Sequence, residues 1–151
     1  KDNLNQEKES LVLIEQAISL KDDVVDFWHL YAESLVKNNR IADADTAYLK
    51  AIELSENKNI PLLLDYAEYN ANQNTIEAAI DFILNIDDDV ADYRVYYRLT
   101  AFSLKLGKIN NALEALEIAL TNNAKELNLL TNYYPDALKF VEVVSLIEQY
   151  K

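Results

Sequence analysis

The chain of 151 residues has no cysteine, no methionine, one glycine, two prolines and one histidine. Without cysteine it can form no disulfide, no thiolate nucleophile and no cysteine-based zinc site. With His29 as the single histidine, a histidine-rich metal site is excluded, and no spacing indicates a nucleophile–histidine–acid arrangement. Scarce glycine and proline favour long uninterrupted helices over a β-sandwich or a barrel.

Long apolar runs and net positive charge are also missing. No apolar stretch approaches the roughly 20 residues that a membrane-spanning helix needs, so we expect no direct membrane insertion. The net charge is 14 − 26 = −12, which would repel phosphate backbones, so nucleic acid is not expected as a partner. We expect a soluble protein of the cytoplasm or the periplasm. Its richness in Asn, Lys, Ile and Asp gives the compositional impression of a bacterial source.

No motif points to catalysis or to a cofactor. The acidic run 87–89 lacks the alternating acids, the central glycine and the distal glutamate of a calcium-binding EF-hand loop. We expect these acids at a helix start, where they stabilise the positive end of the helix. Gly107 lies at an expected helix turn, so no glycine-rich phosphate loop exists. We therefore expect a protein that is not an enzyme and that holds no cofactor and no metal.

What the chain does contain is an internal repeat of about 34 residues. The predicted helix turns end at Ile41, Ile76 and Ile109, which are 35 and 33 residues apart. Asn and Gly near these turns tolerate the left-handed conformation that ends a helix. A period of this kind is the signature of a helical repeat array. Equivalent positions in the three copies are Trp28, Leu63 and Tyr96; Ala32, Ala67 and Thr100; and Ala44, Ala79 and Ala112.

The clearest copy, 28–35 followed by Ala44 and Tyr48, resembles the tetratricopeptide repeat (TPR), whose pattern is W-x2-L-G-x2-Y and then A-x3-F. Tyr31 stands in place of the leucine and Ala32 in place of the glycine. The resemblance implies an all-α fold, a right-handed solenoid of stacked antiparallel helix pairs that share one core. It also implies large residues such as Trp28 wedged between paired helices, and a protein that binds other chains.

We expect a single TPR-like domain over 1–151. Its parts are the second helix of a truncated repeat (4–22), three full repeats (25–58, 60–92 and 93–123), and a degenerate repeat or capping helix (124–151). Because the chain begins within a repeat and without Met, we expect it to be a fragment of a longer protein. The truncated repeat would expose apolar residues that could drive dimerisation through this first helix, namely Leu11, Val12, Ile14 and Ile18.

The last segment, 136–150, is expected to form one helix. Leu138, Val141, Val144 and Ile147 would make one apolar side, opposite an acidic side with Glu142. A last helix with a polar outer face resembles the cap that keeps a solenoid soluble. One more degenerate repeat is the alternative interpretation.

In the TPR family the first helix of each repeat lines a concave groove. Carried over by position, the resemblance implies that partner-binding residues include His29, Glu33, Leu64, Glu68, Arg94, Tyr97 and Ala101. Arg98 lies one helical turn after Arg94 on the same face. Because arginine forks match carboxylates, an acidic side chain or a peptide carboxylate is an expected guest. In the alternative, the two arginines pair with acids of the chain itself.

His29 and Glu33, at i and i+4, allow two interpretations. They form either a pH-sensitive pair that lines the groove or an exposed contact that contributes a few tenths of a kcal/mol. TPR domains that clamp the acidic ends of heat-shock chaperones carry cations and amides at fixed groove positions. Here Glu33 and Asp65 occupy two of these positions and would repel a carboxylate terminus, so such a clamp is not expected.

The leading hypothesis is a non-catalytic scaffold that binds a peptide or a partner helix through the concave groove. Tyr97 and Leu64 would supply apolar contacts, and Arg94 with Arg98 the contact to an anion. The alternative is an architectural or regulatory TPR segment of a larger enzyme or signalling protein.

Overall fold

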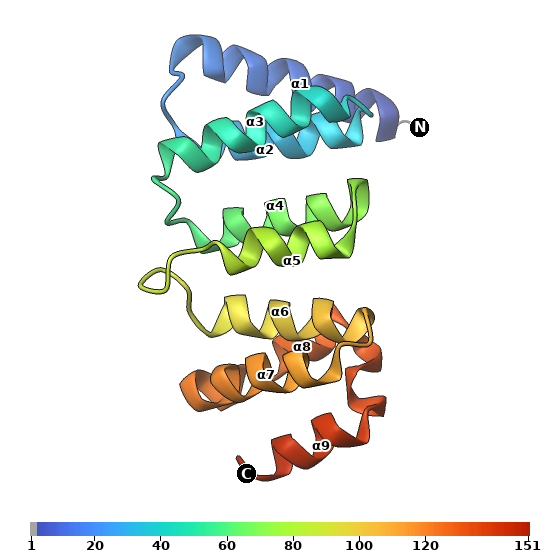
Figure 1. Cartoon of the computed structure of the whole chain (residues 1–151). Coiled ribbons are helices and arrows are strands. Elements are labelled where there is room, and N and C mark those ends of the chain that lie inside the picture. The colour runs from blue at the N-terminus through green and yellow to red at the C-terminus, as the bar shows by residue number, and fades with distance from the viewer. Residues whose placement is uncertain (1–2) are drawn as a thin grey trace. The chain divides into compact units, whose positions relative to one another are not determined.

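The computed structural model describes the backbone of residues 3–151 and, within this range, contains helices and no strand. The predicted all-α class is therefore confirmed for the described residues. Among them no helix is both long enough and apolar enough to pass through a bilayer. In chain order the helices are α1 (Asn3–Leu20), α2 (Val25–Lys37), α3 (Ile41–Leu54), α4 (Ile60–Gln73), α5 (Ile76–Leu84), α6 (Tyr93–Lys105), α7 (Ile109–Asn123), η1 (Ala124–Glu126), α8 (Asn128–Tyr133), η2 (Pro135–Lys139) and α9 (Val141–Glu148) (Figure 1).

The chain falls into two compact units, residues 1–63 and residues 64–151. Helices α1, α2 and α3 belong to the N-terminal unit, and α5 to α9 belong to the C-terminal unit. Helix α4 begins in the first and continues into the second. Within the N-terminal unit α1 packs on α2 and α2 packs on α3; within the C-terminal unit α6 packs on α5, α7 and α8.

The turns that follow α2 and α6 have the conformation expected from their sequence. Asn39 and Gly107 follow α2 and α6 with φ of 62° and 73°. Most residues adopt this left-handed region at a cost that glycine avoids and asparagine tolerates, so the predicted use of Asn and Gly is confirmed at these two turns. It is wrong at the turn between α4 and α5, where Asn74 does not have a positive φ.

Two helices of the C-terminal unit begin with side-chain caps. The Thr75 hydroxyl accepts a hydrogen bond of 3.0 Å from the amide N–H of Ala78, at the start of α5. The Asp92 carboxylate accepts one of 2.9 Å from the amide N–H of Arg94, at the start of α6. Residues 87–89 precede this cap in a turn, so the expectation that they lie at the helix start is wrong. Asp92 alone takes that role because the helix begins directly after it.

The small residues that recur with the repeat are the most deeply buried positions of their helices. All six have no solvent exposure: Ala32, Ala67, Thr100, Ala44, Ala79 and Ala112. A side chain without bulk lets two helix backbones approach closely, so the repeat in the sequence marks where helices touch. In the C-terminal unit the Tyr66 ring lies edge-on to the Phe82 ring, with centroids 5.0 Å apart, which joins α4 to α5.

The large residue that opens the first copy of the repeat is less buried than expected. Trp28 is only half-buried. Its indole N–H donates a hydrogen bond of 2.8 Å to the carbonyl of Asp22, and its ring lies edge-on to Tyr31 at 5.9 Å. The polar N–H turns this ring toward the loop before α2, so part of the indole stays in contact with water.

The last segment does not form the single helix that was expected. A 3₁₀ turn (η2) begins at Pro135, Phe140 is extended, and α9 starts anew at Val141. This break resets the helical register, so Val143 and Ile147 face the core whereas Val141 is 72 % exposed. The prediction of one buried apolar side carrying Leu138, Val141 and Val144 is therefore wrong, because all three are exposed and the outer face is not wholly polar.

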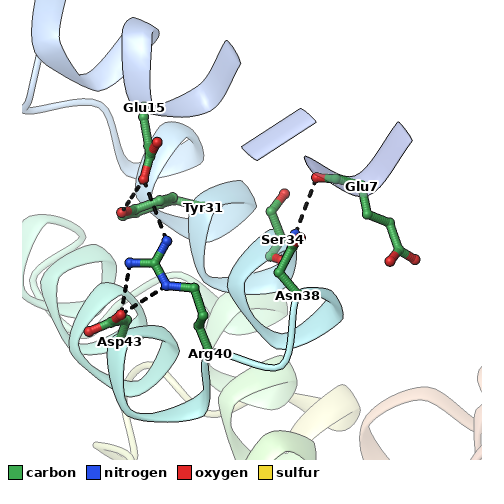
Figure 2. A network of polar contacts seen from close by, with 7 residues as sticks. All are labelled: Glu7, Glu15, Tyr31, Ser34, Asn38, Arg40 and Asp43. Atoms are coloured by element: carbon green, nitrogen blue, oxygen red, sulfur yellow. Dashed lines mark hydrogen bonds and ion pairs between the residues drawn. The ribbon is translucent and has the colours of Figure 1, made fainter. Parts of the chain in front are cut away.

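A polar network fastens α1 to its neighbours in the N-terminal unit (Figure 2). The Tyr31 hydroxyl donates a hydrogen bond of 3.1 Å to the Glu15 carboxylate. Burial and this carboxylate raise the pKa of Tyr31. The Arg40 guanidinium lies 3.9 Å from the same carboxylate and 2.8 Å from that of Asp43. One acid of α1 thus contacts both a side chain of α2 and the residue that precedes α3.

A second contact ties the start of α1 to the end of α2. The Asn38 amide donates to the carbonyl of Glu7 at 3.2 Å (Figure 2). The apolar contribution of α1 is small, because Leu11 is its one buried side chain among the described residues. The expectation that Leu11 is exposed is therefore wrong, since α1 packs on α2, whereas Val12 and Leu13 are more than half exposed.

Candidate functional site

The candidate site is a groove of about 260 Å³ within the C-terminal unit. Three helices and the start of a fourth supply its walls, and they bring charged, amide and aromatic side chains together. The lining residues are Glu68, Ala71 and Asn72 from α4, Ile76 from α5, Arg98, Phe102 and Lys105 from α6, and Asn132 and Tyr133 from α8. We call it the Arg98 groove.

Arg98 lies at the bottom of this groove and is only 4 % exposed. The central carbon of its guanidinium is 4.3 Å from the centroid of the Phe102 ring and 4.4 Å from that of Tyr133. Phe102 is one turn further along α6, and Tyr133 comes from α8. A cation over aromatic faces is attracted by the ring quadrupoles, and more strongly where water is excluded. The two rings therefore keep a charged group stable in a buried place.

Glu68 is the counter-ion of Arg98. Nη2 of Arg98 donates a hydrogen bond to a carboxylate oxygen of Glu68, across from α6 to α4. Burial lowers the pKa of Arg98 and the Glu68 charge opposes this, although a guanidinium remains protonated at any physiological pH. The Glu68 side chain is 55 % exposed. Water therefore screens this ion pair, and it holds Arg98 weakly compared with a pair buried on both sides.

Most of the hydrogen-bonding capacity of Arg98 is unused. A guanidinium has five N–H donors. In the described part of the chain its only hydrogen bond goes to Glu68. No buried nitrogen of these residues lacks a partner, so the other donors of Arg98 reach the open space of the groove. They can donate hydrogen bonds to an anionic guest.

The rim adds positive charge and amides. Lys105 is exposed, with its Nζ atom 5.6 Å from the centroid of the Tyr134 ring. Asn72 and Asn132 are exposed on other sides of the opening. The charged lining residues are two cations and one acid, so the groove carries a local charge of +1 in a chain of −12. An anion is thus attracted to this place more than to the rest of the surface.

Tyr97 and Ala101, which the resemblance places in the groove, are fully buried in the core of the C-terminal unit. The expectation that Tyr97 offers an exposed apolar contact is wrong, because α8 packs on α6 and covers that face. The Tyr97 hydroxyl donates a hydrogen bond of 2.8 Å to the carbonyl of Asn123. Burial, with a smaller effect of the nearby Glu126 charge, raises the pKa of Tyr97 to about 12.

Leu64 and Arg94 also do not line the Arg98 groove. Leu64 is buried, so the expectation that it offers an apolar contact to a partner is wrong. Arg94 is half-exposed and bound to the Asp92 carboxylate, with Nη2 2.6 Å from the nearer oxygen. Both arginines therefore pair with acids of the chain, as the alternative interpretation held, but only Arg98 faces an open groove.

His29 and Glu33 lie on α2, in the N-terminal unit. Nε2 of His29 is 3.6 Å from a carboxylate oxygen of Glu33, and the His29 ring is 6.0 Å from the Tyr48 ring. Glu33 also lines a groove of about 510 Å³ between α1 and α2, beside the exposed Leu13 and Leu30.

Sequence reasoning missed several residues of the Arg98 groove, among them Phe102, Asn132 and Tyr133. Phe102 follows Arg98 by four residues, so helical spacing alone could have placed it on the same face. Asn132 and Tyr133 belong to the last segment, 124–151, whose residues do not follow the spacing of the three earlier copies. No signal in the sequence tied them to α6.

No protein-family model matches the chain, and a search of curated proteins finds no match either.

Proposed function

We propose that this chain is a TPR-type α-solenoid segment that serves as a non-catalytic scaffold for protein–protein interaction. Two observations support the solenoid. The helix turns recur at intervals of 35 and 33 residues, and the small residues of equivalent positions are all without exposure. Residues 124–151 would be its degenerate last repeat. A repeat array offers extended surfaces on which another chain can lie.

The guest of the Arg98 groove, in this proposal, is an extended peptide with a carboxylate. The single observation that carries it is a buried Arg98 that lines an open groove and forms one hydrogen bond within the described residues, to Glu68. A guanidinium fork binds a carboxylate through two parallel hydrogen bonds. Lys105 would add attraction at the rim, and the rings of Phe102 and Tyr133 keep the fork in place.

A peptide-display selection against the wild-type protein tests this function, run beside Arg98→Met and Arg94→Met. Both variants lose one cation from the same helix, but only Arg98 lines the groove. We expect enriched acidic peptides on the wild type and on Arg94→Met, and their loss on Arg98→Met. Circular dichroism checks that both variants keep their helices.

Other outcomes would replace the proposal. Enrichment that persists in Arg98→Met would place the binding surface elsewhere on the scaffold. No enrichment on the wild type would favour an architectural or regulatory segment of a larger enzyme or signalling protein. A wild-type dimer in sedimentation that Leu13→Asp dissociates would favour self-association through α1, where Leu13 is 63 % exposed.

A further inference from the structure

Helix α9 packs on α7 within the C-terminal unit (Figure 1). Residues of these two helices line a second groove of this unit, of about 440 Å³. Its apolar lining consists of Leu113 from α7 and of Val141 and Leu146 from α9. Leu113 and Leu146 are half-buried against the core, whereas Val141 is largely exposed. We call it the α7–α9 groove. Its apolar side chains gain little from burial within the chain, because part of each remains in water.

Three glutamates flank this apolar strip: Glu114 and Glu117 on α7, and Glu142 on α9. All three are exposed, and none forms an ion pair or a side-chain hydrogen bond within the described part of the chain. No lysine or arginine lines the groove. The lysines that flank α9, Lys139 and Lys151, each pair with an acid three residues away. The groove thus holds a local charge of −3 with no counter-ion.

The unpaired glutamates and the exposed apolar side chains raise the free energy of the unoccupied groove, and a suitable partner would lower it. Glu114 and Glu117 are three residues apart on one helix face, where like charges repel. Apolar surface left in water between them adds to that cost. A binding partner that covers the apolar strip and brings cations to both sides relieves both at once, whereas a purely apolar or an acidic partner does not.

We propose that the α7–α9 groove docks an amphipathic helix of a partner protein, with an apolar ridge flanked by lysine or arginine. Helix-in-groove binding uses residues at i, i+3, i+4 and i+7, which would meet Leu113, Val141 and Leu146. The glutamates would then face the flanking cations. A second copy of this chain fits less well, because its net charge is −12. The inference is independent of the Arg98 groove, which attracts the opposite charge.

The probe is a fluorescent 18-residue peptide, with leucines at helical i, i+3, i+4 and i+7 spacing and lysines on the flanks. A scrambled peptide of the same composition controls for charge alone. Fluorescence anisotropy compares three proteins: the wild type, a variant with Glu114→Gln, Glu117→Gln and Glu142→Gln, and a variant with Asp87→Asn, Asp88→Asn and Asp89→Asn. The two variants change the net charge equally, but residues 87–89 lie in the turn before α6, outside the groove.

We expect the ordered peptide to bind the wild type and the aspartate variant alike, and the glutamate variant about tenfold more weakly. That factor corresponds to three exposed ion pairs of ordinary strength. Val141→Ser should also weaken binding, since it removes apolar contact without changing charge. Because all four side chains are exposed, the variants should keep the helical circular dichroism of the wild type.

Three results would overturn the inference. Equal weakening in the glutamate and aspartate variants would mean that only the overall charge attracts the peptide. Equal binding of the ordered and scrambled peptides would mean that no helix is recognised. A wild-type dimer that Val141→Ser converts to a monomer in sedimentation would assign the groove to a second copy of the chain.

Discussion

The exchange of Glu68 for Gln separates two roles of this side chain, because its effects on stability and on binding should have opposite signs. Glu68 is the only hydrogen-bonding partner of Arg98 in the described chain. If an acidic peptide binds in the Arg98 groove, its carboxylate competes with Glu68 for the same guanidinium and also lies beside a like charge. Glutamine keeps the shape of the side chain and removes that charge.

The magnitudes follow from the exposure of the pair. The Glu68 side chain is 55 % exposed, so the ion pair is screened and its loss should lower the free energy of unfolding by about 1 kcal/mol or less. A ligand carboxylate bound to Arg98 would lie about 5 Å from that of Glu68. Two like charges at about this distance repel by about 0.8 kcal/mol even in the dielectric of water. Removing the repulsion should tighten peptide binding about fourfold.

The assay uses one labelled glutamate-rich peptide and three proteins, the wild type, Glu68→Gln and Arg98→Met. Fluorescence anisotropy gives Kd, and urea unfolding followed by circular dichroism gives stability. We expect Glu68→Gln to bind more tightly while unfolding at slightly lower urea, and Arg98→Met to lose binding.

The reasoning is refuted if Glu68→Gln binds the peptide no better than the wild type while Arg98→Met fails to bind. In that case Glu68 would take part in recognition rather than compete. If Arg98→Met binds like the wild type, the groove itself is not the site. Measurements at two salt concentrations provide the control, since the gain from Glu68→Gln should shrink as ions screen the repulsion.

Three further predictions concern the core. Tyr97→Phe should cost about 1 kcal/mol, because the carbonyl of Asn123 loses its donor. The folded pKa of Tyr97 lies above its usual 10, at about 12, so the unfolded chain releases this proton first and stability falls as pH rises from about 10 to 12. Tyr97→Phe should flatten that fall in urea titrations. Trp28→Ala should cost about 2 kcal/mol in urea unfolding, below the range of about 3–5 kcal/mol for a fully buried ring. Ala112→Val should lower the free energy of unfolding by about 1–3 kcal/mol, because the buried site has no room for a larger side chain. The matched control is Ala42→Val at an exposed position, which should change it by no more than about 0.5 kcal/mol; thermal unfolding measures both variants.

The helical class and the places where helices touch could be predicted from sequence because both depend on local, periodic information. Ala44, Ala79 and Ala112 recur at helical repeat spacing, and each lies at a point without exposure. The left-handed turns at Asn39 and Gly107 could likewise be predicted from the residue type at each position.

The open face of α6 could not be predicted in the same way. Groove positions carried over from a repeat family assume that the next repeat leaves them free. Here α8 packs across α6, so Tyr97 is in the core and Tyr133 enters the site. The contact depends on side chains far apart in the sequence, and residues 124–133 carry no periodic signal. The helix break at Phe140 could not be predicted either, because there is neither a glycine nor a proline at this position.

Because few apolar contacts hold α1, its local unfolding should require little free energy. Leu11 is the one buried side chain of α1 among the described residues, and the hydrogen bonds of Glu15 and Glu7 that hold this helix are short-range and polar. Local unfolding of a peripheral helix requires only the free energy of its own contacts, which is less than that of the whole domain. The amide hydrogens of α1 should therefore exchange with solvent earlier than those of α6, in which eight residues are buried. A protease should cut α1 while the α6 region is still folded.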